Sequence, residues 1–346
     1  MMTFQRIAER CLAMGLFVCG LHAVNASADT VEGFYRGKNI SLIIGSGEGA
    51  SYDLVGRLIG QYLQRYIPGQ PTIVPRNMPG ASSVRATEYF YNAMPRDGTS
   101  LAFVQPTVVL NKITDPTAKY EPREFKWLGR VGEVVTVGVV WHTAPAHTVE
   151  EATQKEVIFG AAGATGYAAT IPWALNRLIG TKFNVVRGYQ SMATEILAME
   201  RGEVQGIGSL VWDYFPVSKP DWVEKKMVLP IYTISLARYR SLPEVPTIVE
   251  LAKNDLDRNV MKLFAGTLTI GYAIAATPQI PDDRLSALRN AFDSAVRDPE
   301  FLAEAKRRDT EVDPLSGPEV DRIVADLVAM PREVIDKMNT IVQPPR

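Results

Sequence analysis

The sequence predicts an α/β protein built from two lobes. Strand-like and helix-like patterns alternate through most of the chain, and short clusters of Gly, Pro, Asp or Asn separate them. This alternation is typical of α/β sheets with parallel strands. The 346 residues also exceed what one hydrophobic core comfortably organises. Two strand–loop–helix units with small-residue loops lie far apart in the chain, which suggests one unit in each lobe.

The first 28 residues differ from the rest. Arg6 and Arg10 precede a mostly apolar stretch, CLAMGLFVCGLHAV, and residues 26–28 read Ala-Ser-Ala. This arrangement is typical of a secretory signal peptide, so we expect residues 1–28 to be removed on export. Cys19 leaves a lipoprotein signal open as the alternative.

Composition excludes several classes of protein. The only cysteines, Cys11 and Cys19, lie in the leader, so the exported chain has no disulfide, catalytic thiolate or cysteine-ligated zinc. A net charge of -1 with no basic block is unlike a nucleic-acid-binding protein. We expect no metal and no cofactor.

The first strand–loop–helix unit opens the exported chain. A strand is expected at 40–45, and a helix at 52–66 shows the 3.6-residue apolar period. Further elements are expected in the order strand 71–75, helix 83–94 and strand 99–105. A long β-prone run then extends from Val131 to Trp141.

A second unit repeats this arrangement. It comprises a strand at 156–161, a GATG loop at 163–166 and a helix at 168–179. A helix at 191–201 and β-prone runs at 227–234 and 264–274 follow. The last part is helical, with amphipathic stretches at 281–296, 299–308, 317–329 and 331–341. We expect strand crossings near 131–140 and 264–274 to form a hinge between the lobes.

The loop after the first strand is a candidate anion site. Gly45, Gly47 and Ala50 match the looser dinucleotide fingerprint, G-x-G-x-x-G/A, but no acid follows about 20 residues later to hold the ribose hydroxyls. A small anion asks for less, because the first turn of a helix leaves backbone N–H groups unpaired. Ser51 can bind such an anion or cap the helix, and Asp53 either caps the helix or opposes a ligand amine.

Signs of catalysis are scarce. His142 and His147 are the only histidines after the leader, and the chain has no HExxH or G-x-S-x-G motif. Both histidines are better explained as structural or surface residues. The pair Asp282-Asp283 fits the first turn of a helix, where the helix dipole favours acids.

Several stretches together are similar to one family. They are FYRGKNISLIIGSGEGASYDLVGRLIGQYLQRYIPGQPTIVPRNMPGASSVRATEYFYNAMPRDGTSLAFVQ, VVRGYQSMATEILAMERGEVQG, LPEVPTIVELA and ATPQIPDDRLSALRNAFDSAVRDPEF. They resemble the extracytoplasmic solute receptors of the tripartite tricarboxylate transporter family, the Bug receptors. The resemblance implies a type II periplasmic binding protein of the Venus-flytrap kind, with a mixed sheet flanked by helices in each lobe. It further implies a periplasmic monomer that captures a small organic acid and delivers it to membrane subunits of the transporter.

The resemblance also implies the lobes and the site. One lobe comprises residues 29–137 and 266–346, and the other comprises 138–265. In the family, two loops grasp carboxylates largely through backbone N–H groups. The matching residues here are Gly47, Glu48, Gly49, Ala50, Ser51, Tyr52 and Asp53 in the first loop, and Ala162, Gly163, Ala164, Thr165, Gly166 and Tyr167 in the second.

Four further side chains are expected near the ligand. They are Ser82, Gln105, Thr107 and Tyr189. Of these, Gln105, Thr107 and Tyr189, like Thr165, lie in loops after predicted strands, where open α/β sheets bind ligands. Rings of Tyr52, Tyr167 and Tyr189 would suit an aromatic acid if they line the cleft, and burial in the sheet edges is the alternative. Two other functions stay open, a sensor for a signalling partner and an exported enzyme acting on a carboxylate.

Overall fold

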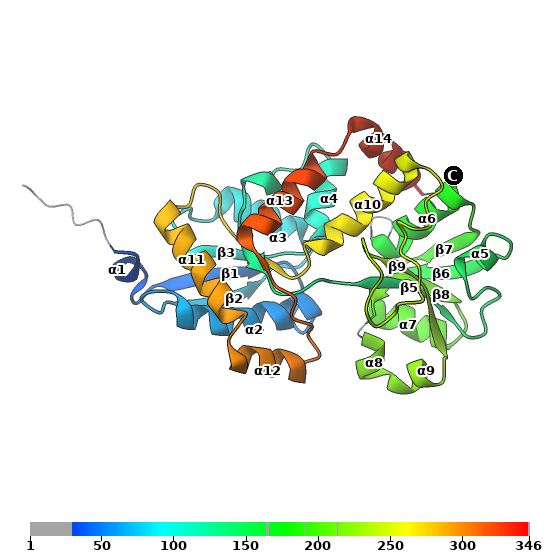
Figure 1. Cartoon of the computed structure of the whole chain (residues 1–346), viewed down its shortest axis with the longest axis horizontal. Helices are drawn as coiled ribbons and strands as arrows, with labels where there is room; N and C mark the ends of the chain where they lie inside the picture. Colours follow the sequence, from blue (N-terminus) through cyan, green and yellow to red (C-terminus); the bar gives the residue numbers. More distant parts are fainter. Residues whose placement is uncertain (1–29, 164–165, 190, 213, 345–346) are drawn as a thin grey trace, which may run out of the picture.

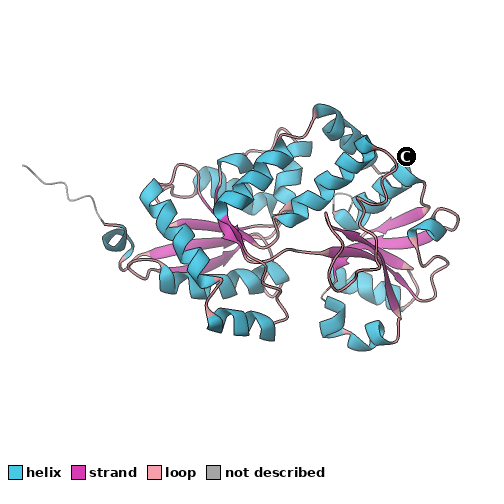
Figure 2. Ribbon diagram, viewed as in Figure 1, coloured by secondary structure: helices cyan, strands magenta, loops and turns pink. Residues whose placement is uncertain are grey.

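The chain forms two separate β-sheets, each covered by helices (Figures 1 and 2). The structure is a computed structural model that describes residues 30–163, 166–189, 191–212 and 214–344. The leader, Cys19 and the predicted cleavage site lie outside these residues. Among the described residues, no helix is both long and apolar enough to span a membrane.

The first sheet has the strand order β11-β4-β10-β3-β1-β2. Its strands are β1 (Asn39–Ile44), β2 (Thr72–Asn77), β3 (Ser100–Phe103), β4 (Lys126–Arg130), β10 (Ala273–Ala276) and β11 (Leu315–Ser316). Strand β1 pairs in parallel with β2 and β3, whereas β10 is antiparallel to β3 and β4. Its helices are α1 (Val31–Tyr35), α2 (Ser51–Tyr66), α3 (Val84–Ala93), α4 (Thr107–Thr114), α11 (Asp282–Ala295), α12 (Pro299–Arg307) and α13 (Gly317–Val328).

The second sheet has the strand order β7-β6-β8-β5-β9. Its strands are β5 (Thr136–Trp141), β6 (Val157–Ala161), β7 (Phe183–Arg187), β8 (Gly206–Val211) and β9 (Val228–Ile234). Strand β6 is parallel to β7 and β8, and β5 is antiparallel to β8 and β9. The helices are α5 (Val149–Ala152), α6 (Tyr167–Ile179), α7 (Met192–Glu200), α8 (Tyr214–Ser218) and α9 (Pro220–Glu224). The predicted fold class, two mixed sheets flanked by helices, is confirmed.

The connections between the sheets differ from the predicted strand crossings. The first is an irregular segment, 131–135, and β5 begins only at Thr136. In the second, α10 (Asp255–Thr269) precedes β10, so the first half of the predicted strand run 264–274 is helical. Asn254 caps α10, which is buried at Val260 and Met261 and then continuously from Leu263 to Leu268. A continuously buried stretch has no periodicity that separates helix from strand, so the predicted strand run began inside this helix.

Arg130 holds both connections together. Arg130, at the end of β4, is 3% exposed. Its Nη1 donates to the Thr269 carbonyl at 2.7 Å, and its Nη2 pairs with the Asp313 carboxylate at 2.5 Å. Backbone bonds add to this contact, because the Tyr272 N–H donates to the Gly132 carbonyl at 3.0 Å. The first connection, the end of α10 and the segment before β11 therefore meet at one point.

Helix α14 (Arg332–Ile341) contacts elements of both sheets. It packs on α10 and α4 and also on α6 of the second sheet. The Arg177 Nη1 of α6 donates to the Ile341 carbonyl at 2.5 Å, and Lys337 pairs with Asp257 of α10. Figure 1 shows α14 and α10 lying over the gap between the two sheets. One hydrophobic cluster is continuous across these helices.

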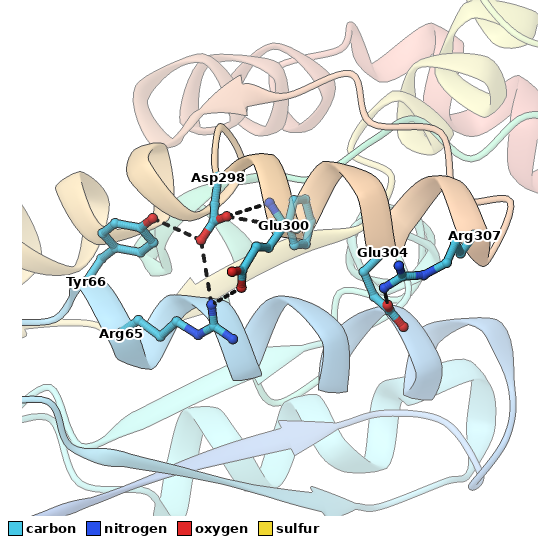
Figure 3. A network of polar contacts seen from close by, with 7 residues as sticks. Arg65, Tyr66, Asp298, Glu300, Glu304 and Arg307 are labelled. Carbon is cyan, nitrogen blue, oxygen red and sulfur yellow. Dashed lines mark hydrogen bonds and ion pairs between the residues drawn. The ribbon is translucent and has the colours of Figure 1, made fainter.

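Polar contacts join α12 to α2, one of the helices that cover the first sheet (Figure 3). Asp298 caps α12 through the Glu300 N–H at 2.7 Å and accepts a hydrogen bond from the Tyr66 hydroxyl at 2.9 Å. Arg65 pairs with Glu300 at 2.8 Å and stacks over the Tyr62 ring. These contacts fasten α12 to the C-terminal end of α2.

Candidate ligand-binding site

Four helices start without a side-chain cap where strands of the two sheets end. Helices α2, α3, α4 and α6 follow β1, β2, β3 and β6. Their N-cap residues are Ala50, Ser83, Pro106 and Gly166, and none of these caps the helix with a side-chain hydrogen bond. Other helices, such as α10 with Asn254, do have a side-chain cap. Uncapped first turns leave N–H groups available to an anion.

In the first predicted loop, the residues before α2 are exposed, whereas the acid Asp53 is buried. Gly47 is half-buried, and residues Glu48 to Ser51 are exposed. Asp53 is 3% exposed and accepts hydrogen bonds from the Gly49 N–H at 2.8 Å and from Arg57 at 2.7 Å. Burial alone would raise the pKa of Asp53, but these bonds and one from Asn77 lower it overall. Asp53 therefore shapes the loop that carries the exposed residues.

The end of β2 differs from a dinucleotide-binding unit. Asn77 occupies the position where such units hold the ribose with an acid. Its Nδ2 donates to Asp53 at 2.8 Å and to the Ser46 carbonyl at 3.0 Å. The Ser46 hydroxyl, in a residue only 7% exposed, has no hydrogen-bond partner among the described residues.

Ser83 joins the loops that follow β1, β2 and β3. Its hydroxyl donates to the Gly45 carbonyl at 2.9 Å and accepts the Gln105 N–H at 3.1 Å. A Cβ atom on Gly45 would lie 2.2 Å from the Ser83 hydroxyl oxygen, so only glycine fits there. The Thr107 hydroxyl donates to the Ser82 carbonyl at 3.3 Å. The predicted residues Ser82, Gln105 and Thr107 thus lie in one connected group.

Backbone strain marks the same group. Ala81, Ser82 and Ser83 have φ values of 46°, 49° and 72°, in the left-handed region that L-residues rarely occupy. Gly80, just before them, has a φ of 134°. Such a run is held only where the surroundings impose it, and it is common at functional sites. Here the turn exposes Ser82 while directing Ser83 into the core.

Tyr52 and Tyr167 are buried beside the second connection. Each is less than a tenth exposed, and burial raises both pKa values. The Tyr52 hydroxyl donates to the Gly271 carbonyl and the Tyr167 hydroxyl to the Phe264 carbonyl, both at 3.3 Å. Tyr52 also packs on Tyr272, with ring centroids 4.9 Å apart. A tyrosine from each predicted loop is therefore attached to α10 or its end.

The second predicted loop contacts a buried acid, Glu195. Ala162 and Gly163 are exposed, Gly166 is the N-cap of α6, and Ala164 and Thr165 lie outside the described residues. Glu195, in the first turn of α7, is 4% exposed. Burial raises its pKa from 4.5 to about 7, and the Ala162 N–H opposes this rise as a hydrogen-bond donor. The pattern of the sequence gave no sign of Glu195 beyond an acid near a helix start.

A pocket of about 580 Å³ brings four predicted residues together: Ser82, Thr107, Gly166 and Tyr167. Its wall combines α3, α4, α6, α10 and α14. The first loop, Gln105 and Tyr189 do not line it. Tyr189 is half-buried and packs against Gly160 of β6. The described residues contain no group of acids and histidines suited to a metal ion.

Pocket residues from the C-terminal half escaped prediction. They are Phe264, Met338, Val342, Gln343 and Pro344. Phe264 and Met338 lie in helices with an ordinary amphipathic pattern and the other three follow α14, so only the fold reveals that they line a pocket.

Comparison with known proteins places the chain in a family. Residues 56–340 match the family model described as the tripartite tricarboxylate transporter family receptor. A solute-binding protein from Polaromonas, solved without ligand, shares 20% identity with a TM-score of 0.66, covering 88% of this chain and 99% of that one. The periplasmic binding protein BugD shares 16% identity with a TM-score of 0.64, covering 89% and 98%.

A third structure extends the same likeness. MatC from Rhodopseudomonas palustris, solved with bound malate, shares 18% identity with a TM-score of 0.60, covering 88% of this chain and 99% of that one. None of the curated proteins searched gives a match. These structural similarities establish a common fold, and the family model covers more than half of the chain. The protein therefore belongs to the receptor family of tripartite tricarboxylate transporters.

Proposed function

We propose that this receptor captures a small carboxylate between its lobes and presents it to the membrane subunits of a tripartite transporter. The observation that carries the proposal is the set of four uncapped helix N-termini at the strand ends, three of which border the pocket. Charge-assisted hydrogen bonds are worth about 1.5–3 kcal/mol each, and a micromolar dissociation constant requires about 8 kcal/mol. Several such bonds are enough to support binding of this strength after the loss of ligand freedom.

Related proteins support the chemical class. MatC was solved with malate, and another protein of R. palustris, at 20% identity and a TM-score of 0.62, was solved with adipate. Both ligands are carboxylates. The exposed Glu48 is compatible with this class, because its side chain is free to point into solvent.

The proposal includes lobes, export and assembly. We assign residues 29–137 and 266–346 to one lobe and 138–265 to the other, with α14 spanning both. Residues 1–28 act as a cleaved signal peptide, and the mature receptor works in the periplasm as a monomer. It binds its ligand without chemical turnover. Site residues are those expected in the two loops, together with Ser82, Gln105, Thr107 and Tyr189.

Thermal unfolding tests the proposal directly. The purified chain from residue 29 onward is heated with a panel of mono-, di- and tricarboxylates, with amino acids and nucleotides as controls. A ligand at about 100 times its dissociation constant stabilises the folded state by about 2.7 kcal/mol, which gives a clear upward shift in Tm. A shift with NAD and with no acid, or no shift at all, would refute carboxylate capture.

A further inference from the structure

A second cavity lies on the first sheet, away from the predicted ligand loops. It has a volume of about 460 Å³ and shares no lining residue with the pocket at the strand ends. Asn39 and Ser41 of β1 and Ser100 of β3 line it. Ser41 lies three residues before the end of β1, which separates it from the first loop by about 10 Å. The cavity is therefore distinct from the candidate carboxylate site.

The strand register brings polar residues onto one face of the sheet here. Ser41 pairs in parallel with Ser100 of β3 and with Val74 of β2, so these three side chains lie on the same side. Arg76, two residues after Val74, lies on that side too. Helix α3 contacts β1 and β3 and supplies Tyr89 to the cavity wall. The opposite face of β1 is apolar throughout, so the polar floor of the cavity is a local feature.

The polar side chains of this cavity lack partners. The Ser41 and Ser100 hydroxyl oxygens are shielded from solvent, and neither has a hydrogen-bond partner in the described part of the chain. Ser100 is 0% exposed. Within the described ranges, the side chains of Arg76 and Tyr89 also form no hydrogen bond or ion pair. Unpaired buried hydroxyls are unfavourable, so a molecule that offers them acceptors gains binding energy here.

Arg76 makes the cavity positive. Among the described residues that line it, Arg76 alone carries a charge, and it is exposed. Two bases and two acids lie within two positions of a lining residue, so they add no net charge. All four have contacts elsewhere: Lys38 with the Phe34 ring, Glu88 with the Lys119 N–H, Arg96 with the Tyr91 carbonyl, and Asp97 with the Thr99 hydroxyl. A guanidinium beside hydroxyl donors is suited to an oxyanion.

We propose that this cavity binds a small tetrahedral oxyanion such as inorganic phosphate. The donors come from three elements, because Arg76 lies on β2, Tyr89 on α3 and Ser41 on β1. A tetrahedral oxyanion has oxygens in several directions and can meet all three, whereas a planar carboxylate has only two oxygens. A change of rotamer turns the hydroxyl of the half-buried Ser41 into the cavity. The inference does not depend on the proposed carboxylate capture.

Calorimetry with inorganic phosphate tests the inference on the purified chain from residue 29 onward. We expect phosphate and sulfate to bind at least about tenfold more tightly than acetate. Arg76→Gln should weaken phosphate at least about tenfold, because it removes a charge-assisted hydrogen bond. Tyr89→Phe and Ser41→Ala should each weaken it about threefold, the effect of one neutral hydrogen bond. Arg297→Gln removes an equal charge from an exposed position after α11 and should leave phosphate binding unaltered.

The carboxylate panel separates the two sites. Arg76→Gln should keep the Tm of the parent in phosphate-free buffer and also its shifts with carboxylates. Equal phosphate binding by the parent and Arg76→Gln overturns the inference, as does an equal loss in Arg297→Gln. Loss of the carboxylate shifts together with phosphate binding would reveal a single site and overturn it as well. Arg76-dependent phosphate binding with no response to any carboxylate leaves this inference standing and overturns the proposed function.

Discussion

Replacing Glu195 by Gln is expected to stabilise the protein in alkaline solution and to leave it almost unchanged in acid. Glu195 is 4% exposed, and burial raises its pKa from 4.5 to about 7. The folded protein therefore binds this proton more tightly than the unfolded chain does. The free energy of unfolding must fall as the pH rises between these two values, and the full loss is present above the folded pKa.

The magnitude follows from the size of the rise. A change from 4.5 to about 7 corresponds to roughly 3 kcal/mol between the two protonation states. Glutamine has nearly the same shape, can accept the Ala162 N–H and carries no charge. The variant should thus gain about 2–3 kcal/mol over the parent at about pH 8.5 and well under about 1 kcal/mol at about pH 4.

Urea unfolding of parent and variant at a series of pH values measures this difference, because the titration of all other groups cancels between them. Glu203→Gln is the matched control. Glu203 is exposed, and the charges of Glu203 and Glu195 both contribute to raising the pKa of Tyr189. A difference between parent and Glu195→Gln that stays constant with pH would refute the argument, as would an equal response of the control.

Other substitutions test the connections, the attachment of α12 and the loops. Arg130→Met removes the buried guanidinium at both connections and should lower the free energy of unfolding by roughly 3 kcal/mol; an unchanged urea midpoint would argue against these contacts. Asp298→Ala removes the cap of α12 and should lower the free energy of unfolding by about 1–2 kcal/mol. An unaltered Tm in thermal unfolding would show that the cap is dispensable. Gly45→Ala introduces a Cβ 2.2 Å from the Ser83 hydroxyl oxygen and should weaken carboxylate binding at least about tenfold. Unaltered carboxylate binding by Gly45→Ala would contradict the role given to this close approach.

The sequence was most informative where a local pattern determines the structure. Amphipathic periodicity placed the helices α2 and α11 within one or two residues of their observed bounds. It was less informative in the run 264–274, where β-branched residues masked the end of a helix that begins at Asp255. The predicted strand run 131–141 is an irregular segment followed by β5. Residues 131–135 connect the two sheets and have no strand to pair with there.

The candidate site was predictable in its backbone and less so in its side chains. The glycines in the sequence indicated the loops. A glycine such as Gly45 is needed where another segment approaches the backbone too closely for a Cβ atom. The direction of Tyr52 and Asp53 depends on partners from other parts of the chain, Gly271 among them. The pocket wall depends in part on α14, whose position beside α4 is a property of the tertiary fold.

The meeting of the connections at Arg130, together with the contacts of α14 with α6, limits how the lobes can move. A sliding separation would break the bonds of Arg130 and the Tyr272–Gly132 backbone bond together. Rotation about this point can preserve them. Displacement in a rotation grows with distance from the axis, and β2 and β7 are edge strands on the far side of β1 and β6 from the connecting strands. A small turn at Arg130 is thereby amplified into a larger change in the gap between the loops that follow β1 and β6.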